Sequence, residues 1–315
     1  AVVGAVLDDR PELSAEQVTM IEALCQRTGT ITPIAGRPGA GKTYATEAVV
    51  AAHLAAGVTI VGAAVSAAAA AELESAAGFA RSAMPATTVA KLLRDLDQWG
   101  GLAPNATVIV DEASMLSTRD LHRLATHARH ASAVIVLIGD PDQHGPVDVG
   151  GVFQRLCRDR GDDLIRLVEN NRQIDQVERL AIGEYRDGHI ADALARMDNA
   201  GRIVRSRTAG ESFDAMVADW YADHLDGRSD PMIAGPNSTR RALNDRARVL
   251  LKANGELVGE PLVVAGREYL IGDQVVARRN DRRLRNDNSG ESVKNGSAGV
   301  VTALHPNADE VTVEF

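Results

Sequence analysis

One stretch of the sequence has the residue types and the spacing that bind phosphate groups. It consists of Gly36, Arg37, Pro38, Gly39, Ala40, Gly41, Lys42 and Thr43. It fits the pattern G-x-x-x-x-G-K-[ST], in which the lysine reaches the β- and γ-phosphates and the hydroxyl ligates Mg²⁺. Glycines let backbone N–H groups turn toward phosphate oxygens, and the N-terminus of a following helix adds a positive dipole. We therefore predict a nucleotide-phosphate site at residues 36–43, in preference to an ordinary glycine turn.

Two adjacent carboxylates, Asp111 and Glu112, follow the apolar run at residues 107–110. In an enzyme with a phosphate-binding loop, such an aspartate holds Mg²⁺ directly or through water. The next carboxylate can orient and deprotonate an attacking water, which is the work of a general base. Kinases of the adenylate or shikimate type do not need that second acid, so Glu112 favours ATP hydrolysis. The alternative is a solvated strand end.

Two further side chains could contact a γ-phosphate. Gln143 ends the segment Gly-Asp-Pro-Asp-Gln, and its amide could bond the phosphate or the attacking water. That segment alone would equally fit a turn. Arg172 lies in the second half of the chain and could act as an arginine finger. It could equally form a surface ion pair with Glu169, and the residues themselves leave both interpretations open.

Alternating strands and helices must position these residues. Apolar runs that favour buried strands lie at 30–35, 58–64, 107–110 and 133–138. Helical patterns lie between or after them, at 42–56, 67–77, 88–96 and 117–131. This order predicts a parallel sheet covered on both faces, which binds ligands at the carboxyl ends of its strands.

The pattern changes after Gly151. We expect a strand at 165–168, helices at 176–186, 189–197 and 211–225, a short buried strand at 231–234, and a helix from the cap Ser238 to about Asn254. From Leu262 onward the sequence shows short alternating strands separated by Gly and Asn-Asp turns. That pattern predicts a small β-barrel.

Composition limits the partners and the location. The net charge is −9 and aromatic residues make up 3% of the chain, so any nucleic-acid contact depends on local groups. Five arginines between 278 and 285 would track phosphates or form a solvated loop. Cys25 and Cys157 show no metal-binding spacing and suit a reducing compartment. No basic leader or membrane-spanning stretch is visible, and we expect a cytoplasmic protein with no membrane partner.

An ordered set of short segments resembles the motifs of superfamily 1 helicases. In chain order these are 14–17 (like the Q motif), 36–43 (motif I), 61–70 followed by 86–93 (motif Ia), 111–115 (motif II), 139–143 (motif III) and 169–173 (motif IV). Two later segments, 272–284 and 295–299, resemble segments in the helicase region of MobF-type conjugative relaxases. The sequence is thus similar to the RecD-like, 5′-to-3′ branch, over nearly its whole length.

The resemblance implies an α/β fold and a domain order. It implies a RecA-like P-loop NTPase sheet at 1–164, an incomplete second RecA-like domain at 165–260, and a small SH3-type β-barrel at 261–315. The implied activity is that of an ATP-dependent DNA helicase or translocase acting on single-stranded DNA.

The resemblance also implies roles for single residues. ATP and Mg²⁺ would be bound by the phosphate loop, with Thr43 and Asp111 holding the metal. Glu112 would be the general base, Gln143 would sense the γ-phosphate, and Arg172 would contact it across a cleft. Gln17 would recognise adenine.

Some features depart from the family pattern. Ala68 stands where motif Ia commonly has lysine, and His144 follows Gln143 where leucine is common. The last helicase motifs and the nuclease residues of a relaxase are absent from the sequence. We therefore expect a piece of a larger protein, with a relaxase region before it, the rest of the helicase after it, and weak activity of its own.

Two other functions stay open. A RecD-like DNA repair helicase would use the same chemistry in another pathway. A nucleotide-dependent DNA-binding module without efficient hydrolysis would belong to a different class, and an assay of phosphate release with and without single-stranded DNA separates the two classes.

Overall fold

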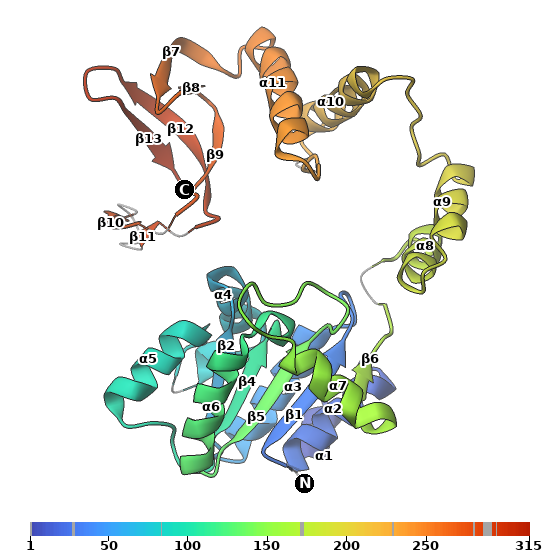
Figure 1. The fold of residues 1–315 in the computed structure, drawn as a ribbon, viewed down its shortest axis with the longest axis vertical. Coiled ribbons are helices and arrows are strands. Elements are labelled where there is room, and N and C mark those ends of the chain that lie inside the picture. Colours follow the sequence, from blue (N-terminus) through green and yellow to red (C-terminus); the bar gives the residue numbers. More distant parts are fainter. Residues whose placement is uncertain are drawn as a thin grey trace. The chain divides into compact units, whose positions relative to one another are not determined.

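The computed structural model describes residues 2–26, 29–82, 84–170, 173–228, 230–279, 281–285, 292–293 and 295–315. The chain divides into two compact units, Ala1–Ala193 and Leu194–Phe315. Figure 1 shows the elements of both units, and each unit is described by itself.

The first unit is built on a six-stranded sheet with the order β3-β2-β4-β5-β1-β6. Its strands are β1 (Ile31–Gly36), β2 (Ile60–Ala64), β3 (Thr87–Thr88), β4 (Thr107–Asp111), β5 (Val134–Gly139) and β6 (Ile165–Leu167). Every pairing in this sheet is parallel. The predicted parallel sheet is confirmed, and β5 lies between β4 and β1, so the ends of these three strands are neighbours.

Helices cover both faces of this sheet (Figure 1). They are α1 (Val2–Asp8), α2 (Ala15–Gln26), α3 (Lys42–Ala55), α4 (Ala67–Ala76), α5 (Val89–Trp99), α6 (Thr118–His130) and α7 (Val152–Arg160), with the short 3₁₀ helices η1 (Phe79–Arg81), η2 (Ala113–Met115) and η3 (Gly161–Asp163). Side chains alternate across the strands, so Val108 and Val110 join one buried cluster with α5 and α6. Ile109 between them joins a second cluster with α2 and α3. This period of two is what buries both faces of the sheet.

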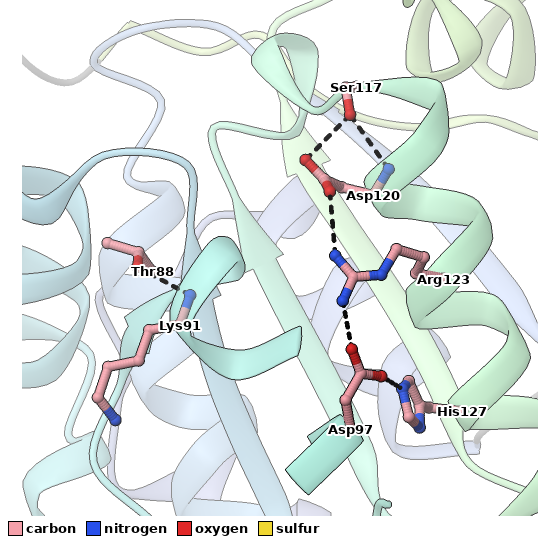
Figure 2. A network of polar contacts seen from close by, with 7 residues as sticks. All are labelled: Thr88, Lys91, Asp97, Ser117, Asp120, Arg123 and His127. Atoms are coloured by element: carbon pink, nitrogen blue, oxygen red, sulfur yellow. Dashed lines mark hydrogen bonds and ion pairs between the residues drawn. The ribbon is translucent and has the colours of Figure 1, made fainter. Parts of the chain in front are cut away.

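Polar contacts fix the ends of α5 and α6 and join the two helices (Figure 2). The hydroxyls of Thr88 and Ser117 cap α5 and α6 by accepting backbone N–H groups of the first turns. Near the end of α5, the carboxylate of Asp97 accepts hydrogen bonds from Arg123 and from His127 on α6, the latter at 2.8 Å. Because Asp97 and Arg123 are largely solvent-exposed, these ion pairs orient the helices more than they stabilise them.

The first unit contains elements that the sequence did not predict. The helices α1 and α7 and the two-residue strand β3 are additional, and α5 extends to Trp99. The strand β6 pairs with β1 along the same sheet. It therefore belongs to the first unit, although the sequence placed a domain boundary before it, at residue 164. In the structure the first compact unit ends at Ala193.

Two helices follow β6. They are α8 (Gln176–Arg186) and α9 (Ile190–Asn199), and the division between the compact units falls within α9. Both were expected within one or two residues. Asp175 caps α8, since its side chain accepts from the backbone N–H of Glu178.

In the second unit two long helices pack on each other. They are α10 (Ala209–Leu225) and α11 (Asn237–Ala253), and their buried contact consists of Val217, Leu243 and Ala247. Two expectations here are wrong. Residues 231–234 form no strand; Ile233 is 84% exposed, and none of the sheets in the described part of the chain includes this segment. Ser238 lies inside α11, whose N-cap is Pro236 without a side-chain cap.

The second unit ends in antiparallel strands. They are β7 (Val258–Val264), β8 (Arg267–Ile271), β9 (Gln274–Val276), β10 (Asp281–Arg285), β11 (Ser292–Val293), β12 (Ala298–His305) and β13 (Glu310–Glu314). They form the sheets β7-β8, β13-β12-β9 and β10-β11. The β character of this region is as predicted, while closure into an SH3-type barrel stays a prediction.

Of the helices that the structure describes, none is long and apolar enough to cross a membrane.

Candidate active site

The phosphate loop has the local structure that its sequence predicts. Strand β1 ends at Gly36 and α3 begins at Lys42, with Gly41 as its N-cap. Gly39 and Gly41 have positive φ angles of 82° and 72°, a region that glycine enters without steric cost. A Cβ atom on Gly36 would lie 2.5 Å from Cδ of Lys42. The loop therefore needs these glycines both for its turn and for the passage of the lysine side chain.

Lys42 extends back over this loop. Its Nζ atom donates a hydrogen bond of 3.0 Å to the carbonyl oxygen of Gly36. The ammonium group is thus held over the loop instead of pointing into solvent. A phosphate oxygen would compete with the Gly36 carbonyl for the same donor, and it would bind more strongly because it is charged.

Asp111 is the last residue of β4 and Glu112 follows it, so the pair lies at the strand end, as predicted. The Oδ1 atom of Asp111 is buried, and no described residue forms a hydrogen bond with it. The pKa of Asp111 is raised, mainly by desolvation. The negative charges of Glu112 and Glu72 also raise this pKa, whereas a hydrogen bond from the backbone N–H of Glu112 and the positive charge of Lys42 lower it. Glu112 has left-handed backbone angles, φ 51° and ψ 40°, which are uncommon for a residue with a side chain.

The donor set around Asp111 fits a magnesium ion. Mg²⁺ prefers carboxylate and hydroxyl oxygens and water. The buried oxygen of Asp111, which lacks a partner among the described residues, is such a ligand. Thr43, which follows Lys42 in the phosphate loop, offers a hydroxyl oxygen as a second one. The neighbouring Glu112 is half-buried and can reach water, which suits a group that must accept a proton.

Gln143 lies in a turn that Asp140 organises after β5. The buried carboxylate of Asp140 accepts hydrogen bonds from the backbone N–H of Asp142 at 3.1 Å and from Nε2 of Gln143 at 3.3 Å. The end of β5 also packs tightly against η2, since a Cβ on Gly139 would lie 2.9 Å from the backbone nitrogen of Ser114. The Asp140 carboxylate, whose importance the sequence did not reveal, thus holds the predicted phosphate sensor.

Gln17 lies against the phosphate loop. Ser14 and Gln17 form a capping box, because Oε1 of Gln17 accepts from the backbone N–H of Ser14 at 2.9 Å and Oγ of Ser14 accepts from the backbone N–H of Gln17. The Nε2 atom of Gln17 donates to the carbonyl oxygens of Ala40 and Gly41, each at 3.3 Å. The side chain is buried, and both of its amide protons are used by the loop. Adenine recognition by Gln17 stays a prediction.

The structure brings most of the predicted groups to one edge of the sheet. The phosphate loop lies at the end of β1 and the Asp111–Glu112 pair at the end of β4. The Gln143 turn follows β5, which lies between these two strands. Arg172 lies outside the described residues, so its role stays a prediction. Arg278 and Arg279 are exposed in the second unit, and the side chains of the next three arginines lie outside the described part.

Comparison with known proteins adds a family and several relatives. Residues 12–208 match the family described as AAA domain. The chain is 30% identical over 312 residues to the conjugal transfer protein TraA of Agrobacterium fabrum, a match that covers 98% of this chain and 27% of that protein. It is also 30% identical over 315 residues to the probable conjugal transfer protein TraA of Sinorhizobium fredii, covering 97% and 27%. The chain spans about a quarter of the length of these curated relatives.

Solved structures of helicases are also similar. The Pif1 helicase from Candida albicans matches with a TM-score of 0.48 and 18% identity, over 92% of this chain and 69% of that one. The Bacteroides sp Pif1 in complex with ADP-AlF4 matches with a TM-score of 0.43 and 18% identity, over 96% and 71%. The resemblance to conjugative transfer proteins that the motifs predicted is confirmed by the TraA matches.

Proposed function

The chain belongs to the AAA domain family, and on this basis we propose that it is the ATP-hydrolysing motor region of a DNA helicase within a conjugative transfer protein. One observation supports this most directly. At the ends of neighbouring strands, a phosphate loop with Lys42 lies beside the half-buried carboxylate of Glu112 and a buried oxygen of Asp111 that has no partner among the described residues. The names of the TraA relatives favour conjugative transfer over DNA repair.

The residues of this chain have separate roles in the proposed reaction. Lys42 leaves the carbonyl of Gly36 and donates to the β- and γ-phosphates of ATP, which the loop N–H groups surround. Mg²⁺ would be held by Thr43 and Asp111 and would neutralise charge that develops on the phosphates. Glu112 accepts the proton of the attacking water. Gln143, held by Asp140, donates a hydrogen bond to the γ-phosphate of ATP and loses this bond when the γ-phosphate is released.

Single-stranded DNA is the proposed polymer on which the motor acts. With a net charge of −9, the chain does not attract DNA through its overall field, so we expect contacts by local groups and by backbone N–H donors. Because few phosphates would then be contacted, the affinity for DNA should fall only modestly as the salt concentration rises.

Phosphate release tests this proposal. Residues 1–315 are assayed with MgATP, with and without single-stranded DNA, beside the Lys42→Ala variant. We expect weak, Mg²⁺-dependent hydrolysis that single-stranded DNA stimulates little and that the variant lacks. Nucleotide binding without turnover in both DNA conditions would contradict the proposal and favour a non-hydrolysing DNA-binding module. Duplexes with 5′ or 3′ tails then determine the direction of unwinding.

A further inference from the structure

The first turn of α2 contacts two segments of the chain at once. Gln17 donates both amide protons to the carbonyls of Ala40 and Gly41 in the phosphate loop. The preceding residue, Glu16, contacts a different segment. Its Oε2 atom accepts hydrogen bonds from the backbone N–H groups of Val168 at 2.7 Å and Glu169 at 3.2 Å. Two consecutive side chains of one helix thus hold the phosphate loop and the backbone that leaves β6.

The phosphate loop and β6 are also bonded to each other. The backbone N–H of Arg37, the second residue of the loop, donates to the carbonyl of Leu167 at 2.9 Å. Leu167 is the last residue of β6, and the two N–H groups that Glu16 accepts belong to the next two residues. The last residue of β6 therefore has one bond to the loop, and the two residues after it have two bonds to α2.

The helix that carries both contacts is fixed firmly in the core. Met20, Ile21 and Leu24 of α2 are buried in the cluster that also contains Ile34 of β1 and Val49 of α3. A helix anchored in this way moves as one body, since its packed side chains resist independent shifts. A displacement of the loop carbonyls at Gln17 is therefore passed on to the carboxylate of Glu16.

We propose that Glu16 is a positioning residue that couples nucleotide occupancy of the phosphate loop to the backbone at Val168 and Glu169. This inference rests on the proposed function, because it requires that the loop binds a nucleotide. When phosphates draw Lys42 away from Gly36, the loop carbonyls that Gln17 holds change position. The carboxylate of Glu16 transmits that change through two charge-assisted hydrogen bonds, which are about twice as strong as neutral ones.

The position of these two hydrogen bonds indicates what the coupling would do. Residues 168–169 are the first that follow the sheet in the direction of α8 and the second unit. A hydrolytic motor needs its nucleotide state to reach the part of the chain that lies beyond the sheet. Among the described residues, Glu16 is the side chain that accepts hydrogen bonds from both of these backbone N–H groups.

Three variants test the coupling. Glu16→Ala removes the acceptor, Glu16→Gln keeps an acceptor oxygen without the charge, and Glu22→Ala removes an exposed carboxylate from the same helix as a matched control. The affinity for Mg·AMPPNP is measured by calorimetry, and kcat and KM for ATP are measured in the presence of single-stranded DNA. Amide exchange of a peptide covering 165–170 is followed with and without Mg·AMPPNP.

For Glu16→Ala we expect kcat to fall by roughly tenfold. A mutation distant from the reacting atoms that misplaces a catalytic group by about 1 Å can lower the rate by up to ~100-fold. KM and AMPPNP affinity should stay within about twofold of wild type, since Glu16 does not touch the loop. The nucleotide-dependent change in amide exchange at 165–170 should disappear. Glu16→Gln should restore most of both effects, and Glu22→Ala should match wild type.

Other results would overturn the inference. A wild-type kcat and a wild-type exchange response in Glu16→Ala would show that no coupling passes through this carboxylate. Equal losses in kcat and AMPPNP affinity would show that Glu16 only supports the fold of the binding site. If wild-type protein does not bind Mg·AMPPNP at all, the proposed function itself fails, which the calorimetry distinguishes from a failure of the coupling alone.

Discussion

Replacing Asp111 by asparagine should stabilise the nucleotide-free protein while it removes magnesium binding. The Oδ1 atom of Asp111 is buried without a partner among the described residues, and desolvation raises the pKa of its carboxyl group. The nearby charges of Glu112 and Glu72 raise it as well. The ionised side chain is therefore a source of instability until a cation binds. Asparagine has almost the same shape and carries no charge.

The size of the effect follows from this environment. Leaving a buried polar group without its partner costs roughly 1–3 kcal/mol, and more when the group is charged. The asparagine amide still lacks one partner, so only the part due to the charge is recovered. We expect Asp111→Asn to raise the free energy of unfolding by about 1 kcal/mol. In a unit of this size that corresponds to a rise in Tm of roughly 2–4 °C.

The gain should depend on pH in a defined direction. Because the folded-state pKa of Asp111 is raised, the folded chain holds this proton more tightly than the unfolded chain does. The penalty grows as pH rises from the ordinary aspartate pKa, about 4, and is complete above the raised value. Wild type and Asp111→Asn should therefore differ near neutral pH and converge at pH below about 4.

Thermal and urea unfolding of the two proteins, with and without Mg·AMPPNP, measure these quantities. Asp163→Asn, which removes an exposed carboxylate from the same unit, is the control and should leave stability unchanged. Mg·AMPPNP should stabilise wild type and have a much smaller effect on Asp111→Asn. A variant that is less stable than wild type near neutral pH would refute the reasoning, because it would show that the carboxylate is satisfied in the folded chain.

Three further substitutions test single contacts. Lys42→Ala should abolish nucleotide binding in calorimetry, because the phosphates lose their mobile cation. Lys91→Ala, which removes an exposed lysine from α5, should bind nucleotide normally. Glu112→Gln should keep MgATP affinity and lose about 100-fold or more in turnover, the scale of a missing general base; near-normal turnover would show that another group accepts the proton. For Asp97 (Figure 2), hydrogen bonds from His127 and then Arg123 lower the pKa. The stability that Asp97 contributes is thus present above the ordinary aspartate pKa and is lost as pH falls through the lowered folded-state pKa. Asp97→Asn should therefore unfold slightly more easily than wild type near neutral pH and equally easily in strong acid. High salt should reduce the difference near neutral pH.

The sequence predicted the first unit well because the signals there are local and strong. The strands β4 and β5 are short runs of mostly β-branched residues, and the loop at 36–43 requires glycine at fixed positions. The supporting contacts were not predictable in the same way. Asp140 holding Gln143, Glu16 accepting from Val168, and the close approach of Gly139 to η2 all join residues that are distant in sequence or that gain their meaning from a turn.

The second half of the chain was harder to predict because fewer of its residues are buried. Residues 231–234 have the composition of a strand, yet Ile233 is exposed, since strand formation depends on a neighbouring strand that the local sequence does not specify. Ser238 has the chemistry of a cap, but α11 begins before it. The strand β6 was expected to open a new domain, and its pairing with β1 is a long-range contact that composition does not reveal.

The nucleotide-free site holds several groups in arrangements that only a phosphate ligand and a cation would improve. Lys42 is bonded to the carbonyl of Gly36, and breaking a hydrogen bond to a charged group costs about 1.5–3 kcal/mol. A ligand must offer Lys42 an acceptor that is better than a carbonyl, and a phosphate oxygen does so because it is charged. At the same time Asp111 needs a cation to offset its desolvation. A nucleoside meets neither requirement and a phosphate without metal meets only the first, so Lys42 and Asp111 together select a metal-bound phosphate group.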